Sequence, residues 1–412
     1  MEALEGAAGG DDGPVRLFSI LGTGSYGTVY LGLWRGLSVA AKILVVHDTL
    51  LGPEGRLRQR AILEAAIGTT LDHPNVVATY AFDVKPLGVQ PSESEQPSEE
   101  EDPLWRQLGT TQSLRRDWGL AAQSSVGGKA GGADHAHASE ASPSPDVYQL
   151  YILQELCSGG SIKEALEPWG ALSGGLRAGA SFAAASLHLA FQVACGLRHV
   201  HAAGIVHGDI SAGNVLLARQ AAPAPDCDAL GLDEAEQSWR GRLARPGVPP
   251  PPPVVAKVAD FGLSLRLTGS RTHASGLYQG TPVYMAPEVV ANGRVGPASD
   301  VYSFGVLLLE LVMGMPASII RDAVRAVSGG LTVAELRGEI NPMLAVLRSH
   351  LPHDRSPTCP AQLRQLAADC LAPAAGSRPT CTQVAETLVG VLESLAPPAR
   401  PSAEAAPAAP AT

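Results

Sequence analysis

The chain has 412 residues, a formal net charge of -10 and a 45% apolar share, which is ample for a large buried core. The acidic balance argues against nucleic-acid binding, because broad binding of that kind needs a basic surface. Six cysteines without a C-x-x-C pair predict neither a zinc site nor a disulfide framework, but reduced thiols inside a cell.

The first residues, 1–14, lack the basic and apolar segments of a signal peptide, so we predict a flexible N-terminus. The most apolar run, 301–315, is interrupted by Ser303 and Glu310 and is short for a membrane span. We therefore expect a buried helix there, no membrane span, and a cytoplasmic location.

Residues 15–44 are predicted to be strands broken by a glycine turn, with a helix over 56–71 and a strand over 76–82. A strand over 148–156, a long helix over 181–201 and a strand over 254–260 follow, and the pattern from 300 to about 395 is helical. Strands dominate the first part and helices the second. This order predicts the α+β class, with a small β-rich lobe before a larger helical lobe.

Two low-complexity segments interrupt this pattern. Residues 87–146 are acidic and then rich in Gly and Ser, and residues 220–253 end in a proline run that favours polyproline II. Such compositions bury too little apolar surface to offset the entropy of ordering, so we predict disordered inserts. Docking partners for both inserts are possible, and variable surface loops are the simpler interpretation. Residues 396–412 are predicted to be a disordered Ala/Pro tail.

A glycine-rich pattern, G-x-G-x-x-G-x-V, runs through Gly22, Gly24, Gly27 and Val29. Glycines let backbone amides approach phosphate oxygens without interference from side chains. In a dinucleotide fold these glycines would open a helix, whereas here a strand-like VYLGLW follows and favours a hairpin. No Walker A pattern occurs, and a plain tight turn remains the alternative.

Lys42 lies in an apolar strand, where a buried lysine is costly unless it is paired. Glu64 on the following helix is the natural partner. One interpretation is a lysine that is held by a carboxylate and aimed at phosphates; the alternative is a surface lysine at a strand edge.

The segment HGDISAGN, residues 207–214, is more specific. Asp209 offers a carboxylate that can orient and deprotonate a hydroxyl, and Asn214 offers a carbonyl oxygen for Mg²⁺. Asp260, which follows a strand and precedes Phe-Gly, supplies a second metal-binding side chain. Mg²⁺ prefers a few protein oxygens together with substrate phosphates, and this pair provides them.

With GTPVYMAPE at 280–288, these motifs occur in the order found in eukaryotic protein kinases, which the chain resembles over residues 15–395 apart from the inserts. It is most similar to the Ser/Thr kinases of the tyrosine-kinase-like group. The resemblance implies a bilobal protein-kinase fold with ATP and Mg²⁺ as cofactors. It also implies transfer of the ATP γ-phosphoryl group to Ser/Thr hydroxyls of a protein substrate in intracellular signalling.

The resemblance also implies residue roles. Asp209 would be the catalytic base, Lys42 would contact phosphates while paired with Glu64, and Asn214 and Asp260 would hold the metal. The nucleotide would be bound by the glycine loop, the hinge and the residues around them: Leu21, Gly22, Gly24, Gly27, Val29, Ala40, Lys42, Gln154 (the gatekeeper), Glu155, Cys157, Ser161 and Leu216. Asp300 would anchor the backbone of the catalytic loop, and Glu288 would pair with Arg378.

Four positions bear on how such a kinase would work. Gly208 stands where many kinases have Arg, which predicts activity without strong dependence on loop phosphorylation. Ser211 replaces the usual Lys, which predicts a slow enzyme or a substitute cation and keeps a pseudokinase scaffold as the alternative. Gly68 replaces a bulky apolar residue, which predicts a loosely docked helix. Thr281 before Pro282 favours Ser/Thr over Tyr substrates.

Overall fold

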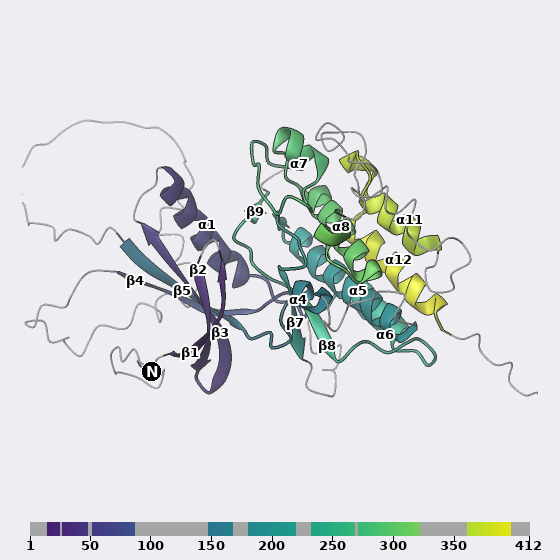
Figure 1. Cartoon of the computed structure of the whole chain (residues 1–412), viewed down its shortest axis with the longest axis horizontal. Helices are drawn as coiled ribbons and strands as arrows, with labels where there is room; N and C mark the ends of the chain where they lie inside the picture. Colours follow the sequence, from purple (N-terminus) through teal and green to yellow (C-terminus); the bar gives the residue numbers. More distant parts are fainter. Residues whose placement is uncertain are drawn as a thin grey trace, which may run out of the picture.

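A computed structural model describes residues 15–24, 27–47, 52–86, 147–167, 180–219, 232–267, 271–320, 322 and 361–396. These residues form two bodies that lie side by side, a twisted sheet with one helix and a larger body of helices (Figure 1). The α+β class and the bilobal arrangement predicted from the sequence are therefore confirmed. The N-terminal 1–14, the insert 87–146 and the tail beyond Ala396 lie outside the described residues.

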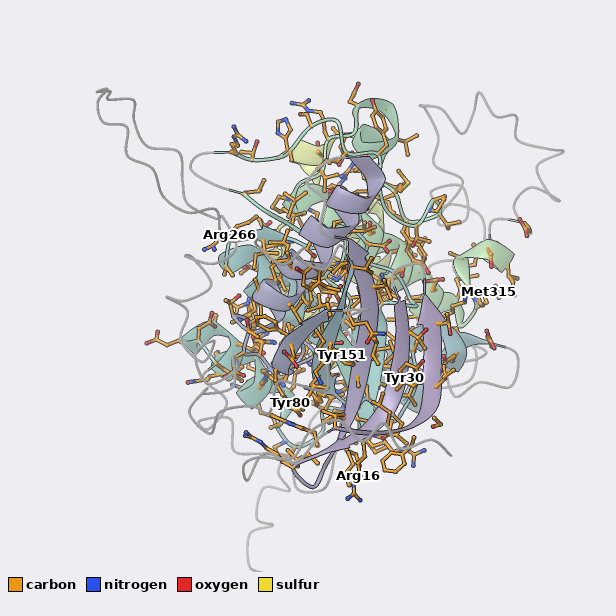
Figure 2. All side chains as sticks on the ribbon, turned by 90° about the vertical axis from the view of Figure 1, so that its left-hand side faces the viewer. Arg16, Tyr30, Tyr80, Tyr151, Arg266 and Met315 are labelled. Carbon is orange, nitrogen blue, oxygen red and sulfur yellow. The ribbon has the colours of Figure 1, made fainter. Side chains whose placement is uncertain are left out.

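The small lobe is an antiparallel five-stranded sheet in the order β1-β2-β3-β5-β4. Its strands are β1 (Arg16–Gly24), β2 (Gly27–Trp34), β3 (Leu37–His47), β4 (Thr79–Pro86) and β5 (Val147–Glu155). Helix α1 (Gly52–Gly68) packs on β3 and β4 and buries apolar residues between helix and sheet: Leu44, Val46, Ala61, Ala65, Leu150 and Ile152. Figure 2 shows this sheet in front of the helices, with Tyr30 on β2 and Tyr151 on β5.

The large lobe is built around α5 (Ala180–Ala202) and α8 (Pro297–Met313). Around these two lie α4 (Ile162–Leu166), α6 (Glu234–Leu243), α7 (Pro287–Asn292), α11 (Ala361–Cys370), η4 (Ala375–Ser377) and α12 (Cys381–Ser394). Two short antiparallel ribbons complete it: β6 (Ile205–Val206) with β9 (Leu265–Arg266), and β7 (Val215–Arg219) with β8 (Val254–Val258).

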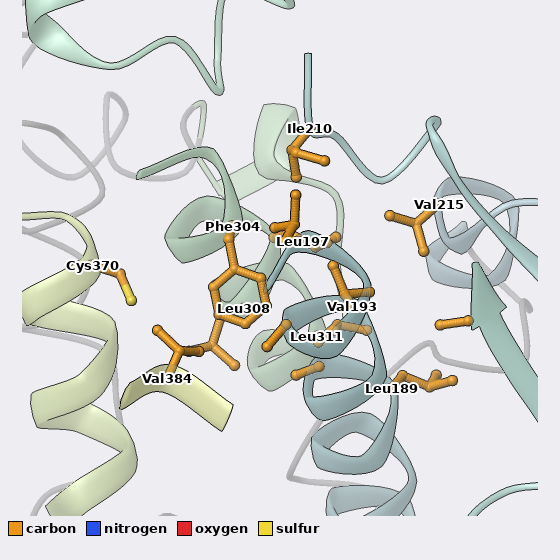
Figure 3. Packing of buried hydrophobic residues seen from close by; sticks show 14 of the residues in the cluster. Leu189, Val193, Leu197, Ile210, Val215, Phe304, Leu308, Leu311, Cys370 and Val384 are labelled. Carbon is orange, nitrogen blue, oxygen red and sulfur yellow. The ribbon is translucent and has the colours of Figure 1, made fainter. Parts of the chain in front are cut away.

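The core of the large lobe explains why α8 is apolar on nearly all sides. A helix that is hydrophobic all round is one that other elements surround. Leu197 of α5, Phe304 and Leu308 of α8 and Val384 of α12 meet in one cluster (Figure 3). The predicted buried helix over 301–315 is confirmed. In the described part of the chain, every helix is too short or too polar to traverse a lipid bilayer.

The prediction of disorder over 220–253 is wrong for residues 232–253, whereas 220–231 lie outside the described residues. Asp233 caps α6, because its side chain accepts a hydrogen bond from Glu236 N–H at 3.0 Å. Trp239 and Leu243 are buried at helical spacing. The proline run also contacts the core, because His188 Nε2 on α5 lies 2.8 Å from Pro249 O. A few large side chains thus hold residues 232–253 in place, although the average composition of the segment predicts disorder.

Candidate active site

The glycine-rich segment forms a β-hairpin, as the strand-like residues after it predicted. Gly22 pairs with Val29, and Gly24 pairs with Gly27, in the ladder between β1 and β2. The glycines therefore close a turn between two strands and do not open a helix, which excludes the dinucleotide-binding alternative. Val29 in turn pairs with Lys42, so the hairpin lies directly beside β3, the strand that carries the lysine.

Lys42 is buried and makes two ion pairs. Its Nζ lies 2.6 Å from Glu64 Oε1 on α1 and 3.1 Å from Asp260 Oδ1, beyond the end of β8. Burial alone would lower the pKa of Lys42, but the carboxylates of Glu64 and Asp260 hold this pKa above its ordinary value. Lys42 therefore carries a positive charge that is held between Glu64 and Asp260, and the surface-lysine alternative is excluded.

The backbone of Asp260 adopts an unusual conformation. Its φ is 62°, in the left-handed region that costs energy for a residue with a side chain and that clusters at functional sites. Oδ1 accepts hydrogen bonds from Lys42 and, at 3.3 Å, from Gly262 N–H. Burial would raise the pKa of Asp260, but Lys42 outweighs it and keeps this pKa low. Asp260 is thus an ionised carboxylate, and among the described residues its Oδ2 has no hydrogen-bond partner.

Asp209 is held by neighbours on both of its carboxylate oxygens. Thr281 N–H and Thr281 Oγ1 each donate to Oδ1 at 2.8 Å. Asn214 Nδ2 donates to Oδ2 at 3.0 Å and to the Asp209 carbonyl at 2.8 Å. The Asn214 amide is therefore oriented by Asp209, and its carbonyl oxygen is left as an acceptor.

Asn214 and Asp260 are brought together by the backbone. Ala259 N–H donates to Asn214 O at 2.9 Å, which ties the catalytic loop to the residue directly before Asp260. One amide oxygen and one carboxylate oxygen leave most positions of an octahedral cation for phosphate oxygens and water. This donor set fits Mg²⁺, which takes few protein ligands and prefers oxygen.

The catalytic loop, residues 207–214, is held in place by α8. Asp300 at the start of α8 accepts hydrogen bonds from His207 N–H and Gly208 N–H, both at 2.8 Å. His207 Nε2 lies 3.0 Å from Ala259 O. The predicted role of Asp300 as an anchor is confirmed. The predicted pair of Glu288 and Arg378 is also confirmed, with Nη1–Oε1 at 2.7 Å and Nη2–Oε2 at 2.8 Å.

The role of the predicted nucleotide-binding residues stays a prediction, but the structure places most of them on β1, β2, β3, β7 and the end of β5. Ala40 on β3 pairs with Gln154, whose Nε2 donates to Thr79 Oγ1 at 3.4 Å. Leu216 of β7 forms a bridge with Ser161. The Ser161 hydroxyl accepts a hydrogen bond from Glu164 N–H at 3.2 Å and thereby caps α4. Ser161 therefore has a structural role in addition to its predicted role in nucleotide binding. Leu21 on β1 is half exposed.

The hinge, residues 154–157 at the end of β5, has one partner that the sequence did not reveal. Lys257 Nζ on β8 lies 2.8 Å from Glu155 Oε2 and ties the hinge to the large lobe. Burial, with a further contribution from Glu155, raises the pKa of the Cys157 thiol to about 12. Cys157 is therefore a neutral thiol. Its backbone N–H donates to no other backbone group of the described residues, which leaves a donor at the hinge for a ligand.

A family model described as "protein tyrosine and serine/threonine kinase" matches residues 143–388, more than half of the chain. The chain belongs to this kinase family. Its resemblance to eukaryotic kinases of the tyrosine-kinase-like group is thereby confirmed.

This kinase chain is similar to several proteins of Arabidopsis thaliana. It is 26% identical to "LEAF RUST 10 disease-resistance locus receptor-like protein kinase-like 1.2" over 90% of the chain and 42% of that protein. It is 31% identical to a "probable LRR receptor-like serine/threonine-protein kinase PAM74" over 50% of the chain and 20% of that protein. It is 37% identical to a "probable serine/threonine-protein kinase PBL18" over 32% of the chain and 25% of that protein. The kinase chain thus spans less than half the length of these relatives.

Two positions where this kinase departs from the family pattern can be described. Ser211 is buried in the catalytic loop, where its carbonyl accepts from Asn214 N–H at 3.1 Å. Gly68 ends α1 at a point of close contact with β4. A Cβ there would lie 2.2 Å from Thr79 Oγ1, so glycine lets the end of the helix approach β4 closely. The expectation that the helix as a whole is loosely docked stays a prediction.

Proposed function

We propose that this chain transfers the γ-phosphoryl group of ATP to serine and threonine hydroxyls of protein substrates. One observation carries the proposal: the buried cation Lys42 contacts Asp260, while Asn214 contacts Asp209 and accepts from the backbone of Ala259, the residue before Asp260. Phosphoryl transfer depends on positioning and on electrostatic stabilisation, and this set of groups supplies both.

Each side chain has a task that follows from its contacts. Asp209, fixed by Thr281 and Asn214, can accept the proton of an incoming hydroxyl. Lys42, held by Glu64, presents positive charge to phosphate oxygens. Mg²⁺ held by Asn214 and Asp260 would neutralise phosphate charge as the group transfers. The hinge at Glu155 and Cys157, with Val29, Ala40 and Leu216, would receive the adenine.

The preference for serine and threonine rests on Thr281. Thr281 lies directly before Pro282, and its hydroxyl and N–H both donate to the carboxylate of the proposed base, Asp209. Relatives named serine/threonine kinases support the same preference. A cytoplasmic location stays a prediction that suits an enzyme using ATP, and docking partners for the insert 87–146 remain part of this proposal.

The test is transfer of labelled phosphate from ATP to a generic protein, followed by hydrolysis and separation of the phosphoamino acids. We expect phosphoserine and phosphothreonine with the intact chain, and a signal lower by at least about a hundredfold with Asp209→Asn. Phosphotyrosine as the main product would contradict the specificity.

Ser211 favours a second candidate function, because a cation is missing from the catalytic loop at this position. A nucleotide-binding scaffold would bind Mg²⁺ and ATP but transfer no phosphate. Binding measured by calorimetry on the same samples separates the two functions. Tight binding without transfer, in the intact chain, would favour the scaffold.

A further inference from the structure

Gln279 joins two segments that the sequence does not connect. Its Nε2 donates to Leu263 O at 2.6 Å, three residues beyond Asp260. Its Oε1 accepts from Arg60 Nη2 of α1 at 3.2 Å. The side-chain amide is half-buried and uses its donor and its acceptor at once. Helix α1 and the segment after Asp260 are therefore held together by one neutral side chain from the loop before Thr281.

Gly208 provides the room for this amide. Its φ is 79°, a conformation that residues with a side chain rarely adopt. A Cβ at Gly208 would lie 2.9 Å from Leu263 O and 3.2 Å from Gln279 Nε2. Gln279 thus occupies the space beside the catalytic loop where a side chain at position 208 would begin. The glycine and the glutamine fit each other, and a larger residue at 208 would displace the amide.

The contact bears on the catalytic groups through short connections. Arg60 lies one helical turn before Glu64, so both project from the same face of α1. Glu64 is the residue that holds Lys42. On the other side, Gln279 lies two residues before Thr281, which fixes Asp209. A shift of Gln279 would therefore affect the groups that hold Lys42 as well as the groups that hold Asp209.

We propose that Gln279 is a positioning residue that keeps α1 against the segment after Asp260 without a phosphate on the loop. In a kinase with Arg at position 208, that cation gathers a phosphorylated loop residue through charge-assisted bonds. Here a neutral amide with two hydrogen bonds takes over the task. The catalytic part of this proposal rests on the proposed function, whereas the structural part does not.

The test uses the full chain, treated with a phosphatase and checked by mass spectrometry to be free of phosphate. Two measurements are made on each variant: kcat and KM for ATP, and hydrogen exchange of the α1 amides. We expect Gln279→Ala to lower kcat by roughly tenfold, because two hydrogen bonds of ordinary strength are lost. Exchange in α1 should rise while exchange in α5 and α8 stays unchanged, which a general loss of stability would not produce.

A double-mutant cycle isolates the contact. Arg60→Ala should raise exchange in α1 in the same way, and the double variant should add little to either single one. The matched control is Gln365→Ala, an exposed glutamine on α11 with one side-chain hydrogen bond, to Asp369. It should behave like the natural chain in both measurements.

Three results would overturn the proposal: unchanged α1 exchange in Gln279→Ala, additive effects of Arg60→Ala and Gln279→Ala, or a large rise in kcat when the loop is phosphorylated. If the natural chain transfers no phosphate at all, the proposed function fails, and the exchange measurement alone then decides whether Gln279 positions α1.

Discussion

Glu310 lies in the middle of α8, at 1% exposure, and is one of the acidic groups inside the large lobe. Both of its oxygens lie 2.8 Å from the Tyr284 hydroxyl, and Oε1 accepts from Ala317 N–H at 2.7 Å. Burial raises the pKa of Glu310 from 4.5 to about 7, although both hydrogen bonds oppose the shift. The folded protein therefore holds a proton that the unfolded chain has already released near neutral pH.

This proton makes stability depend on pH. The folded state binds more protons than the unfolded state between pH 4.5 and 7, so its extra stability is present at low pH and is lost as pH rises through 7. The loss is on the order of 3 kcal/mol. We expect Glu310→Gln to flatten this part of the profile and to gain relative stability at pH 8. Denaturant unfolding at several pH values measures it, and parallel profiles would contradict the assignment.

Arg378 connects several segments of the large lobe through hydrogen bonds. Besides Glu288, it donates to the carbonyls of Ala372, Ala298 and Pro373. Removing one partner of a buried pair leaves an uncompensated charge, which costs about 3–5 kcal/mol. We expect Arg378→Ala to lower the melting temperature strongly. Arg266→Ala, a change at an exposed position on β9 (Figure 2), serves as the control. Equal melting temperatures for the natural chain and Arg378→Ala would refute the pair.

At the scale of elements, the end of α1 illustrates close packing. Alanine at position 68 should gain about 0.8–1.0 kcal/mol in helix propensity, yet its Cβ would meet Thr79 Oγ1 at 2.2 Å. Overpacking of this kind costs typically about 1–3 kcal/mol, so we expect Gly68→Ala to be destabilising. Thr79→Ala removes the obstructing hydroxyl and should restore stability to the double variant. Additive effects in denaturant unfolding would contradict this close approach.

Helix α6 is attached through a buried carboxylate. Glu236 is fully buried and meets His73 Nε2 at 3.1 Å, Arg198 Nη2 at 3.1 Å and Arg240 Nη2 at 2.7 Å. Burial would raise the pKa of Glu236, but the hydrogen bond from His73 and the charge of Arg240 lower it to about 2. The helix thereby connects α5 with the segment that leads from α1 to β4.

We expect Glu236→Ala to destabilise the chain by about 3–5 kcal/mol, because it strands buried positive charge. Glu234→Ala on the exposed face of the same helix is the matched control and should change stability little. The free energy of unfolding is measured with urea. A cost for Glu236→Ala no larger than that of the control would show that α6 is not attached in this way.

Helix α6 also marks what sequence patterns can predict. Strand alternation and helical spacing located the sheet, α5 and α8, because long periodic segments reflect the face that each element buries. Composition failed over 232–253, because Trp239, Leu243 and Glu236 are few but strongly anchored. An average over a polar, proline-rich segment hides such anchors.

At the scale of the whole molecule, the site depends on how the two lobes meet. Lys42 belongs to the sheet and Asp260 to the large lobe, and their ion pair at 3.1 Å joins the two lobes. Val76 pairs with Val258, and Lys257 contacts Glu155, so backbone and side chains both join the lobes. A change in the angle between the lobes would separate the lysine from the carboxylate.

The residues with chemical roles could be predicted from the sequence, because each lies in a motif with fixed spacing. Two of the groups that hold them, Glu64 and Asp300, were predicted as well. The contacts of Thr281, Gln279 and Lys257 were not, since these residues find their partners only through the fold. At Ser211 the structure adds little to what the sequence indicates. The sequence predicted that a positive charge is missing at this position. The structure places Ser211 as a buried, neutral side chain in the catalytic loop.

The most direct test is single-turnover transfer of labelled γ-phosphate, with nucleotide binding measured on the same samples of the natural chain and of Asp209→Asn. If Asp209 is the base and Lys42, Asn214 and Asp260 hold the triphosphate with Mg²⁺, the variant should bind the nucleotide as the natural chain does. Its transfer rate should be lower by at least about a hundredfold. Equal transfer rates in the two chains would contradict the account.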